Sequence, residues 1–214
     1  MNPDLLSTFV NISSFSIVIP LAIALFQLKT ASREQLILTT LVACSFITEV
    51  IANLLWYQFI NNLAVYNSYA LVNFNLLFLL YYYQFGSKTK KFMVFVQILF
   101  NILAVLNTLF LQKISIFNSN LTTSAALVLI ACALAYFYKL LKEIKYQKLE
   151  KNPLFWINSG VILYYSGSLI LFLLGNVLAY PSLEVALAAW GLNSFFNLLL
   201  NTAYSIALWI RSTK

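Results

Sequence analysis

The stretch KTKKFMVFVQILFNILAVLNTLFLQK, residues 88–113, places three lysines at one end of a long apolar segment and one lysine at the other. Its apolar part, residues 91–111, has the length that an α-helix needs to cross a bilayer, about 20 residues at roughly 1.5 Å rise each. Lysines and arginines are retained on the cytoplasmic side of membranes. The stretch therefore predicts a membrane-spanning helix that begins in the cytoplasm and ends outside, next to Lys113.

Six more apolar segments of similar length lie along the chain, separated by short connections. Basic residues gather at alternate ends of these segments: 12 of the 13 Lys and Arg residues fall on one side, and only Lys113 falls on the other. This asymmetry predicts an all-α, polytopic bundle of seven transmembrane helices, with the N-terminus outside and the C-terminus cytoplasmic. We expect the spans at residues 7–28, 34–57, 64–85, 91–111, 121–141, 154–179 and 184–210.

The composition agrees with a chain surrounded by lipid. Hydrophobic residues make up 62% of the 214 residues and charged residues 9%, whereas a soluble domain has about a quarter of its residues charged. The net charge of +7 would suit nucleic acid in a soluble protein, but here membrane orientation explains it. We therefore expect membrane lipids and no nucleic acid as partners, and a single domain over residues 1–214. The N-terminus MNPDLLSTF lacks a basic region and does not resemble a cleavable signal peptide.

Several residues predict local features of the bundle. Pro20 lies inside the first span and is expected to kink it, because proline cannot donate the backbone hydrogen bond. Gly160, Gly167 and Gly175 lie along the sixth span, where small residues let helices approach closely. The sixth span is therefore expected to be central. The lysine-rich segment 139–151 is expected to extend the fifth helix beyond the bilayer.

Tyrosines and tryptophans near the ends of the spans are interpreted as anchors in the headgroup region. Trp56 ends the second span, Tyr66 and Tyr69 open the third, Tyr81 lies near its other end, and Trp209 ends the seventh.

Glu49 is the only ionisable residue deep inside any expected span. A charged side chain near the bilayer centre costs at least about 2.5–3.5 kcal/mol, so Glu49 is expected to face the bundle interior. Ser45 and Asn53 lie four residues before and after Glu49 and share one helical face with it. In the third span, Asn73 and Asn75 point to different sides, so at most one of them faces the same pocket.

The seventh span carries a polar stripe that runs from Trp190 through Asn193, Asn197 and Asn201 to Tyr204. Two interpretations remain open for such residues. Their amides form hydrogen bonds that hold helices together, at about 0.6 kcal/mol each, or they line a polar cavity. Under the second interpretation, the predicted ligand-binding residues are Glu49, Asn53, Asn73, Tyr165, Asn193 and Asn197.

The sequence offers little for catalysis. The chain has no histidine, and its two cysteines, Cys44 and Cys132, lie in different spans. Paired carboxylates, a nucleophile with a base, and a glycine-rich phosphate loop are all missing. We therefore expect no enzyme activity, no metal and no cofactor. Microbial rhodopsins share the seven-span layout, but residues 184–210 contain no lysine that would hold retinal.

The segments NPLFWINSGVILYYSGSLILFLL, residues 152–174, and FNSNLTTSAALVLIACALAYFYKLLKE, residues 117–143, resemble a family of uncharacterised seven-helix integral membrane proteins of Gram-negative bacteria. The resemblance implies a multi-pass protein of the bacterial inner (cytoplasmic) membrane. It brings no established activity, cofactor or catalytic residue. Similar helices near signalling kinases in related sequences favour a sensory role.

Three functions are compatible with these features. The leading hypothesis is a receptor-like or sensory membrane component that binds a small or lipidic ligand and signals through a cytoplasmic or membrane partner. The first alternative is a small-solute transporter or channel, proton-coupled through Glu49. The second is a scaffold for another membrane protein.

Overall fold

The computed structural model describes residues 3–143, 148–178 and 183–210, without the side chains at several edges of these ranges. Three of the 12 basic residues that sort to one side, Lys145, Arg211 and Lys214, lie outside them.

The described chain is all-helical, as predicted. The helices are α1 (Pro3–Phe15), α2 (Val18–Gln27), α3 (Arg33–Tyr57), α4 (Leu63–Gln84), α5 (Ser87–Phe110), α6 (Ser119–Glu143), α7 (Pro153–Leu178) and α8 (Leu183–Trp209). Short 3-10 turns follow α2 and precede α7, at Leu28–Thr30 and Leu149–Lys151.

Six helical segments are long and apolar enough to cross a membrane. They are Thr8–Thr30, which contains the end of α1 together with α2, and the helices α3 to α7. The helix α8 is 27 residues long but is not among these six, and it carries the asparagines 193, 197 and 201. The chain is therefore compatible with a membrane protein built on at least six spans.

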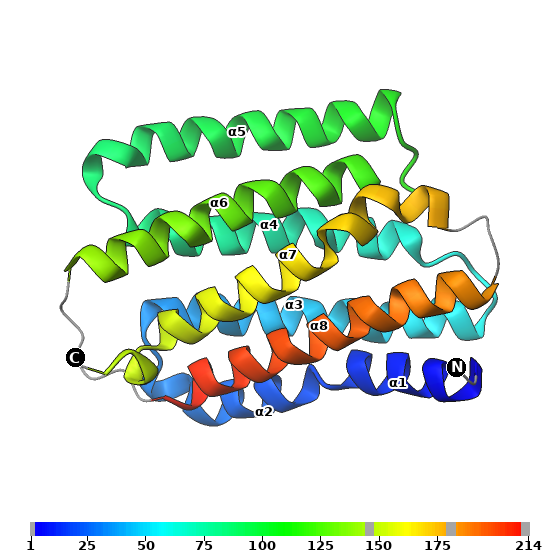
Figure 1. Ribbon diagram of the computed structural model, residues 1–214, viewed down its shortest axis with the longest axis horizontal. Coiled ribbons are helices and arrows are strands. Elements are labelled where there is room, and N and C mark those ends of the chain that lie inside the picture. The colour runs from blue at the N-terminus through cyan, green and yellow to red at the C-terminus, as the bar shows by residue number, and fades with distance from the viewer. Residues whose placement is uncertain (1–2, 144–147, 179–182, 211–214) are drawn as a thin grey trace.

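The helices lie side by side, with their long axes roughly aligned (Figure 1). The basic end of the bundle, on the left in Figure 1, holds the start of α3 and α5 and the ends of α6 and α8. Arg33, Lys88, Lys90, Lys91 and Lys142 belong to those helix ends. The chain enters α1 at the opposite end of the bundle, and Lys113 follows α5 there. Apart from Lys113, these basic residues are sorted to one end, as the sequence predicted.

The first span is broken rather than merely bent. The break comprises residues 16–17, between Phe15 and Val18, one turn before Pro20. Proline has no N–H to donate to the Ser16 carbonyl, and this oxygen instead accepts from the Ile19 amide at 3.2 Å. The kink predicted from Pro20 is confirmed, in the form of two separate helices.

The helix α7 is central, as the glycines predicted, and packs extensively against α6 and α8. A Cβ added at Gly160 would lie 2.8 Å from the Ala203 Cβ of α8, closer than real Cβ contacts come. A Cβ at Gly167 would lie 2.3 Å from the ring of Phe196, also on α8. These two glycines therefore permit the close approach of α7 and α8.

The helix α5 lies at the edge of the bundle, where an amide cluster joins it to α4 (Figure 1). Asn75 Oδ1 accepts from Asn101 at 2.9 Å and from Gln97 at 3.0 Å. Much of α5 is exposed and apolar, including Phe95 and Leu109. Such a surface suits contact with lipid chains.

Two sequence-based interpretations were wrong here. Tyr81 is not an interface anchor: it is 1% exposed, and its hydroxyl donates to Asn158 Oδ1 on α7 at 2.7 Å. The segment 139–151 does not continue as one α-helix to its end, because Lys148 has an extended backbone and Leu149–Lys151 forms a 3-10 turn. Residues 144–147 of this segment lie outside the described residues. Trp56 and Trp209, in contrast, are exposed, as anchors would be. Cys44 and Cys132 are both free.

Candidate functional site

A cavity of about 370 Å³ lies inside the bundle, in the half away from the basic end. Its walls come from α1 and the break, from α3, α4, α7 and α8, and from the start of α6. It is partly enclosed. Polar side chains from six helices converge on it, in a bundle whose remaining core is largely apolar.

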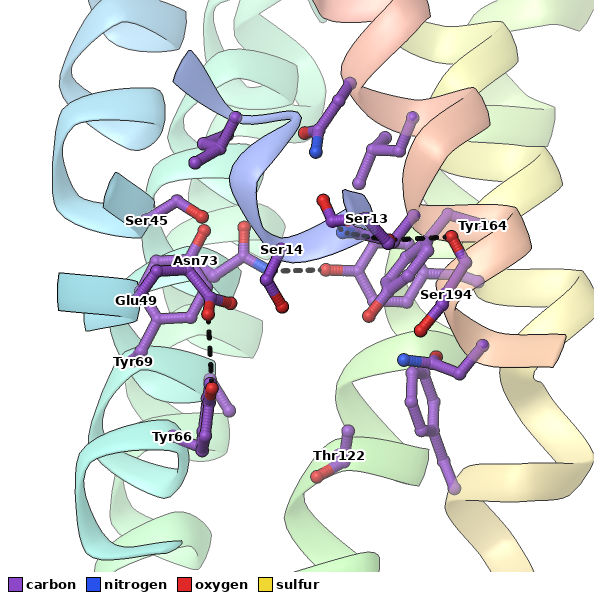
Figure 2. A pocket seen from close by; sticks show the side chains of 18 of the residues that line it. Ser13, Ser14, Ser45, Glu49, Tyr66, Tyr69, Asn73, Thr122, Tyr164 and Ser194 are labelled. Atoms are coloured by element: carbon purple, nitrogen blue, oxygen red, sulfur yellow. Dashed lines mark hydrogen bonds between the residues drawn. The ribbon is translucent and has the colours of Figure 1, made fainter. Parts of the chain in front are cut away.

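Glu49 of α3 lines this cavity and is the only charged side chain to do so among the described residues. The Tyr66 hydroxyl of α4 donates to Glu49 Oε2 at 3.2 Å, and the Ser14 hydroxyl of α1 is a second donor to the carboxylate. Figure 2 shows Glu49 beside Ser45 and Tyr69, with Ser14 between this group and Tyr164. Neutral hydroxyl groups therefore surround the carboxylate, and no Lys or Arg is among the residues that line the cavity.

The break in the first span is held by α8. The Ser13 hydroxyl donates to the Ser194 carbonyl oxygen at 2.8 Å, and the Asn197 amide donates to Ser13 Oγ at 3.1 Å. One turn further along α8, Asn201 donates to Ser16 Oγ at 2.7 Å. Two of the three stacked asparagines therefore bind the residues around the break, and the stripe supports the wall of the cavity.

The helices α4 and α7 contribute the rest of the polar wall. The Asn73 amide donates to the Tyr165 hydroxyl at 2.6 Å. Tyr69 and Tyr164, one from each helix, interact through hydrogen bonds with Ser45 and Asn193 respectively. These bonds orient the phenol groups toward neighbours in the bundle.

Two polar atoms of the lining have no hydrogen-bond partner among the described residues. They are Asn193 Oδ1 and Tyr204 Oη, and both are buried. A buried polar group without a partner costs about 1–3 kcal/mol, so native proteins rarely leave one unpaired without a reason.

The structure brings together five of the six residues predicted for the site. Glu49, Asn73, Tyr165, Asn193 and Asn197 all line the cavity.

Asn53, the sixth, is not among the residues that line the cavity. Its amide donates to the backbone oxygen of Glu49 at 2.8 Å, within its own helix. Each step of four residues turns an α-helix by about 40°, so a stripe with this spacing drifts away from a pocket. Ser45 and Glu49 remain on the cavity side, and the inclusion of Asn53 was wrong as a matter of geometry.

The sequence analysis missed several residues of the lining. Tyr66 and Tyr69 line the cavity, although their position at a span end favoured an anchoring role. Ser13, Ser14 and Ser194 also line it, and no sequence signal singled them out. The complete stripe on α8, from Trp190 to Tyr204, faces the cavity, so its spacing was the signal that could have identified more of the site.

The side chains that line this cavity are of the kinds that bind small molecules. The cavity contains one carboxylate, hydroxyl and amide groups, and aromatic rings. Across the described part of the chain, no group of three or more acidic or cysteine side chains is placed to hold a metal ion. Such a site can bind a small molecule with hydrogen-bonding groups through a largely preformed set of contacts.

Comparison with protein-family models, with curated proteins and with solved structures finds no match.

Proposed function

We propose that this chain is a seven-span protein of the bacterial inner membrane that acts as a receptor-like or sensory component. It binds a small or lipidic ligand in the polar cavity among α1, α3, α4, α7 and α8. The observation that carries the proposal is the cavity itself, about 370 Å³ with Glu49 and polar side chains from six helices on its walls. Its volume lies in the range of small-molecule sites, roughly 300–1,000 Å³.

The break in the first span gives the cavity a means of responding to a ligand. Ser13 and Ser14 line the cavity just before the break, and Ser13 and Ser16 are bonded to α8. A ligand that changes these contacts would shift α1 relative to α2, which runs toward the basic end. The basic end, with Lys88, Lys90 and Lys91, is the proposed contact surface for a cytoplasmic or membrane signalling partner.

The same break supports a second candidate function, a small-solute transporter that is proton-coupled through Glu49. Secondary transporters place broken helices at their binding sites near the middle of the membrane. Flux measured in liposomes separates the two candidates. Solute uptake that is lost in Glu49→Gln identifies a transporter, whereas binding without flux identifies a sensor.

A phenylalanine at Ala125 is expected to abolish ligand binding. Ala125 is 4% exposed and lines the cavity from α6, so a larger side chain there takes up space that the ligand needs. We expect the ligand affinity to fall at least about tenfold, the equivalent of roughly 1.4 kcal/mol. The measurement is thermal unfolding of the purified protein in nanodiscs, against a library of small polar molecules and lipids.

Ala135→Phe is the matched control, because Ala135 lies on the same helix but is exposed. Compounds that stabilise the unmodified protein should also stabilise this variant. If no compound changes the unfolding temperature, or if Ala125→Phe responds like the control, the cavity is not the binding site.

A further inference from the structure

Among the described residues, Glu49 is the only acidic side chain that lines the cavity, and no Lys or Arg lines it with Glu49. The two donors to its carboxylate, Tyr66 and Ser14, are neutral hydroxyls. An ionised carboxylate only accepts hydrogen bonds, and these two donors suit that form. Burying a carboxylate without an opposite charge is unfavourable, so the site is complementary to a positive charge.

Several aromatic side chains line the same cavity as Glu49. Tyr69 and Tyr164 are close enough to interact electrostatically with Glu49, as is Tyr66. Trp190 also lines the cavity and is held edge-on to Phe117, with ring centroids 5.5 Å apart. The faces of aromatic rings attract cations, most strongly those of tryptophan, and rings of this kind recognise ammonium groups.

We infer that the ligand of this cavity is a small organic ammonium ion, with Glu49 as its counter-ion and the surrounding aromatic rings as its cage. The inference rests on the proposed function and names the ligand class for the same site. A neutral lipid or an anion would leave the Glu49 carboxylate buried without an opposite charge.

Choline and its neutral isostere, 3,3-dimethyl-1-butanol, test the inference because they differ mainly in charge. Binding is followed in nanodiscs by thermal unfolding and by tryptophan fluorescence, since Trp190 lines the cavity. We expect choline to stabilise the protein, and the alcohol to bind at least about tenfold more weakly. Glu49→Gln should reduce choline affinity by at least about tenfold, because truncating one partner of a buried charge pair has a large cost.

Glu34→Gln is the matched control. Glu34 belongs to the first turn of the same helix, is half-buried, and accepts from Gln84 instead of facing the cavity. Its choline affinity should equal that of the unmodified protein. Equal binding of the alcohol and of choline would overturn the cation inference while leaving a cavity ligand in place. Unchanged choline affinity in Glu49→Gln would remove Glu49 as the counter-ion.

A pH titration of the unmodified protein covers the case in which Glu49→Gln does not fold. The quaternary nitrogen of choline does not titrate, so a change in its affinity with pH reports groups of the protein. The titratable side chains that interact with Glu49 are Tyr66 and Tyr69 of α4 and Tyr164 of α7. All three phenols are neutral in acid, so choline affinity should fall as acid protonates Glu49.

An affinity that is constant down to acid pH, or the absence of any choline binding, would contradict the inference. In that case, the screen of small polar molecules and lipids would still test whether the cavity binds any ligand, as the proposed function requires.

Discussion

A leucine at Gly160 should strongly destabilise the bundle, because it forces α7 away from α8. A Cβ at this position would already lie 2.8 Å from the Ala203 Cβ and 3.2 Å from Leu200 Cδ1. The Ala203 Cβ is fixed to the backbone, so relief requires the two helices to move apart. Overpacking of this kind costs about 1–3 kcal/mol, and the branched leucine places the effect at the upper end. Thermal unfolding in detergent, followed by tryptophan fluorescence, measures it.

Two further variants identify the cause. Gly160→Ala should be destabilised, and adding Ala203→Gly should restore much of the lost stability, because the second change removes the atom that the new Cβ meets. Gly86→Leu is the control, since nothing lies within 4 Å of a Cβ there. The free energy of unfolding of Gly86→Leu should fall by less than about 1 kcal/mol, because leucine is a weaker N-cap of α5 than glycine. Equal destabilisation at Gly86 and Gly160, or no rescue by Ala203→Gly, would show that α7 and α8 do not approach as described.

A leucine at Asn158 should produce the second large loss of stability. Asn158 is 1% exposed and joins three helices: its amide donates to the Ala133 carbonyl oxygen of α6 at 3.0 Å, and its Oδ1 accepts from Tyr81 of α4. Leucine preserves the volume but leaves the Tyr81 hydroxyl buried without a partner, at about 1–3 kcal/mol. Interhelical hydrogen bonds in membranes average about 0.6 kcal/mol, so the orphaned hydroxyl dominates the cost.

Tyr81→Phe provides the test of this reason. Combined with Asn158→Leu, it removes the orphaned hydroxyl, so the double variant should be more stable than the sum of the two single effects predicts. Asn53→Leu is the control, because its amide bonds only to the backbone of its own helix. Additive effects in the double variant would mean that Tyr81 and Asn158 are not coupled.

The positions of the helices could be predicted from the sequence because lipid imposes a simple rule. Every span must be apolar and helical, so hydropathy and length locate it. Charge sorting then identified the basic end, where Arg33, Lys88 and Lys142 are found. The break near Pro20 could also be predicted, because a proline lacks the backbone N–H and its ring clashes with the carbonyl oxygen four residues earlier.

Part of the cavity followed from helical periodicity. Residues spaced by four remain on one face over two turns, and this spacing identified Asn193 and Asn197 correctly as neighbours. The opposite directions of Asn73 and Asn75 also followed: Asn73 bonds to Tyr165 at the cavity, and Asn75 bonds to Asn101 on α5.

The other residues of the cavity depend on which helices pack against each other. Patterns within a single segment of the sequence do not reveal this packing. In the sequence, Tyr66 and Tyr81 cannot be told from interface anchors, because both are tyrosines near the end of a span. Only their hydrogen bonds to Glu49 and Asn158 in the folded protein reveal their role inside the bundle. Ser13 and Ser14 reach the cavity because the break at residues 16–17 lies beside α8. Contacts between the first and the last helix join residues about 180 positions apart, beyond any pattern within a segment.

By the positive-inside rule, the half of the bundle that holds the cavity should lie on the outer side of the membrane, and we expect the cavity to open there. This orientation predicts a specific pattern of thiol reactivity. In a background of Cys44→Ala and Cys132→Ala, Ser45→Cys places a thiol on the cavity wall, and Leu99→Cys places one on the exposed apolar face of α5. A membrane-impermeant thiol reagent reacts with thiolates in contact with water, and not with thiols among lipid chains.

Labelling of intact cells with this reagent is the most direct measurement. Ser45→Cys should be modified from outside, and Leu99→Cys should remain unmodified. Modification of Ser45→Cys should also be blocked when Ala125→Phe fills the cavity. A Ser45→Cys variant that is inert from outside, or that reacts only from the cytoplasmic side, would contradict both the outward-facing cavity and the proposed orientation of the bundle.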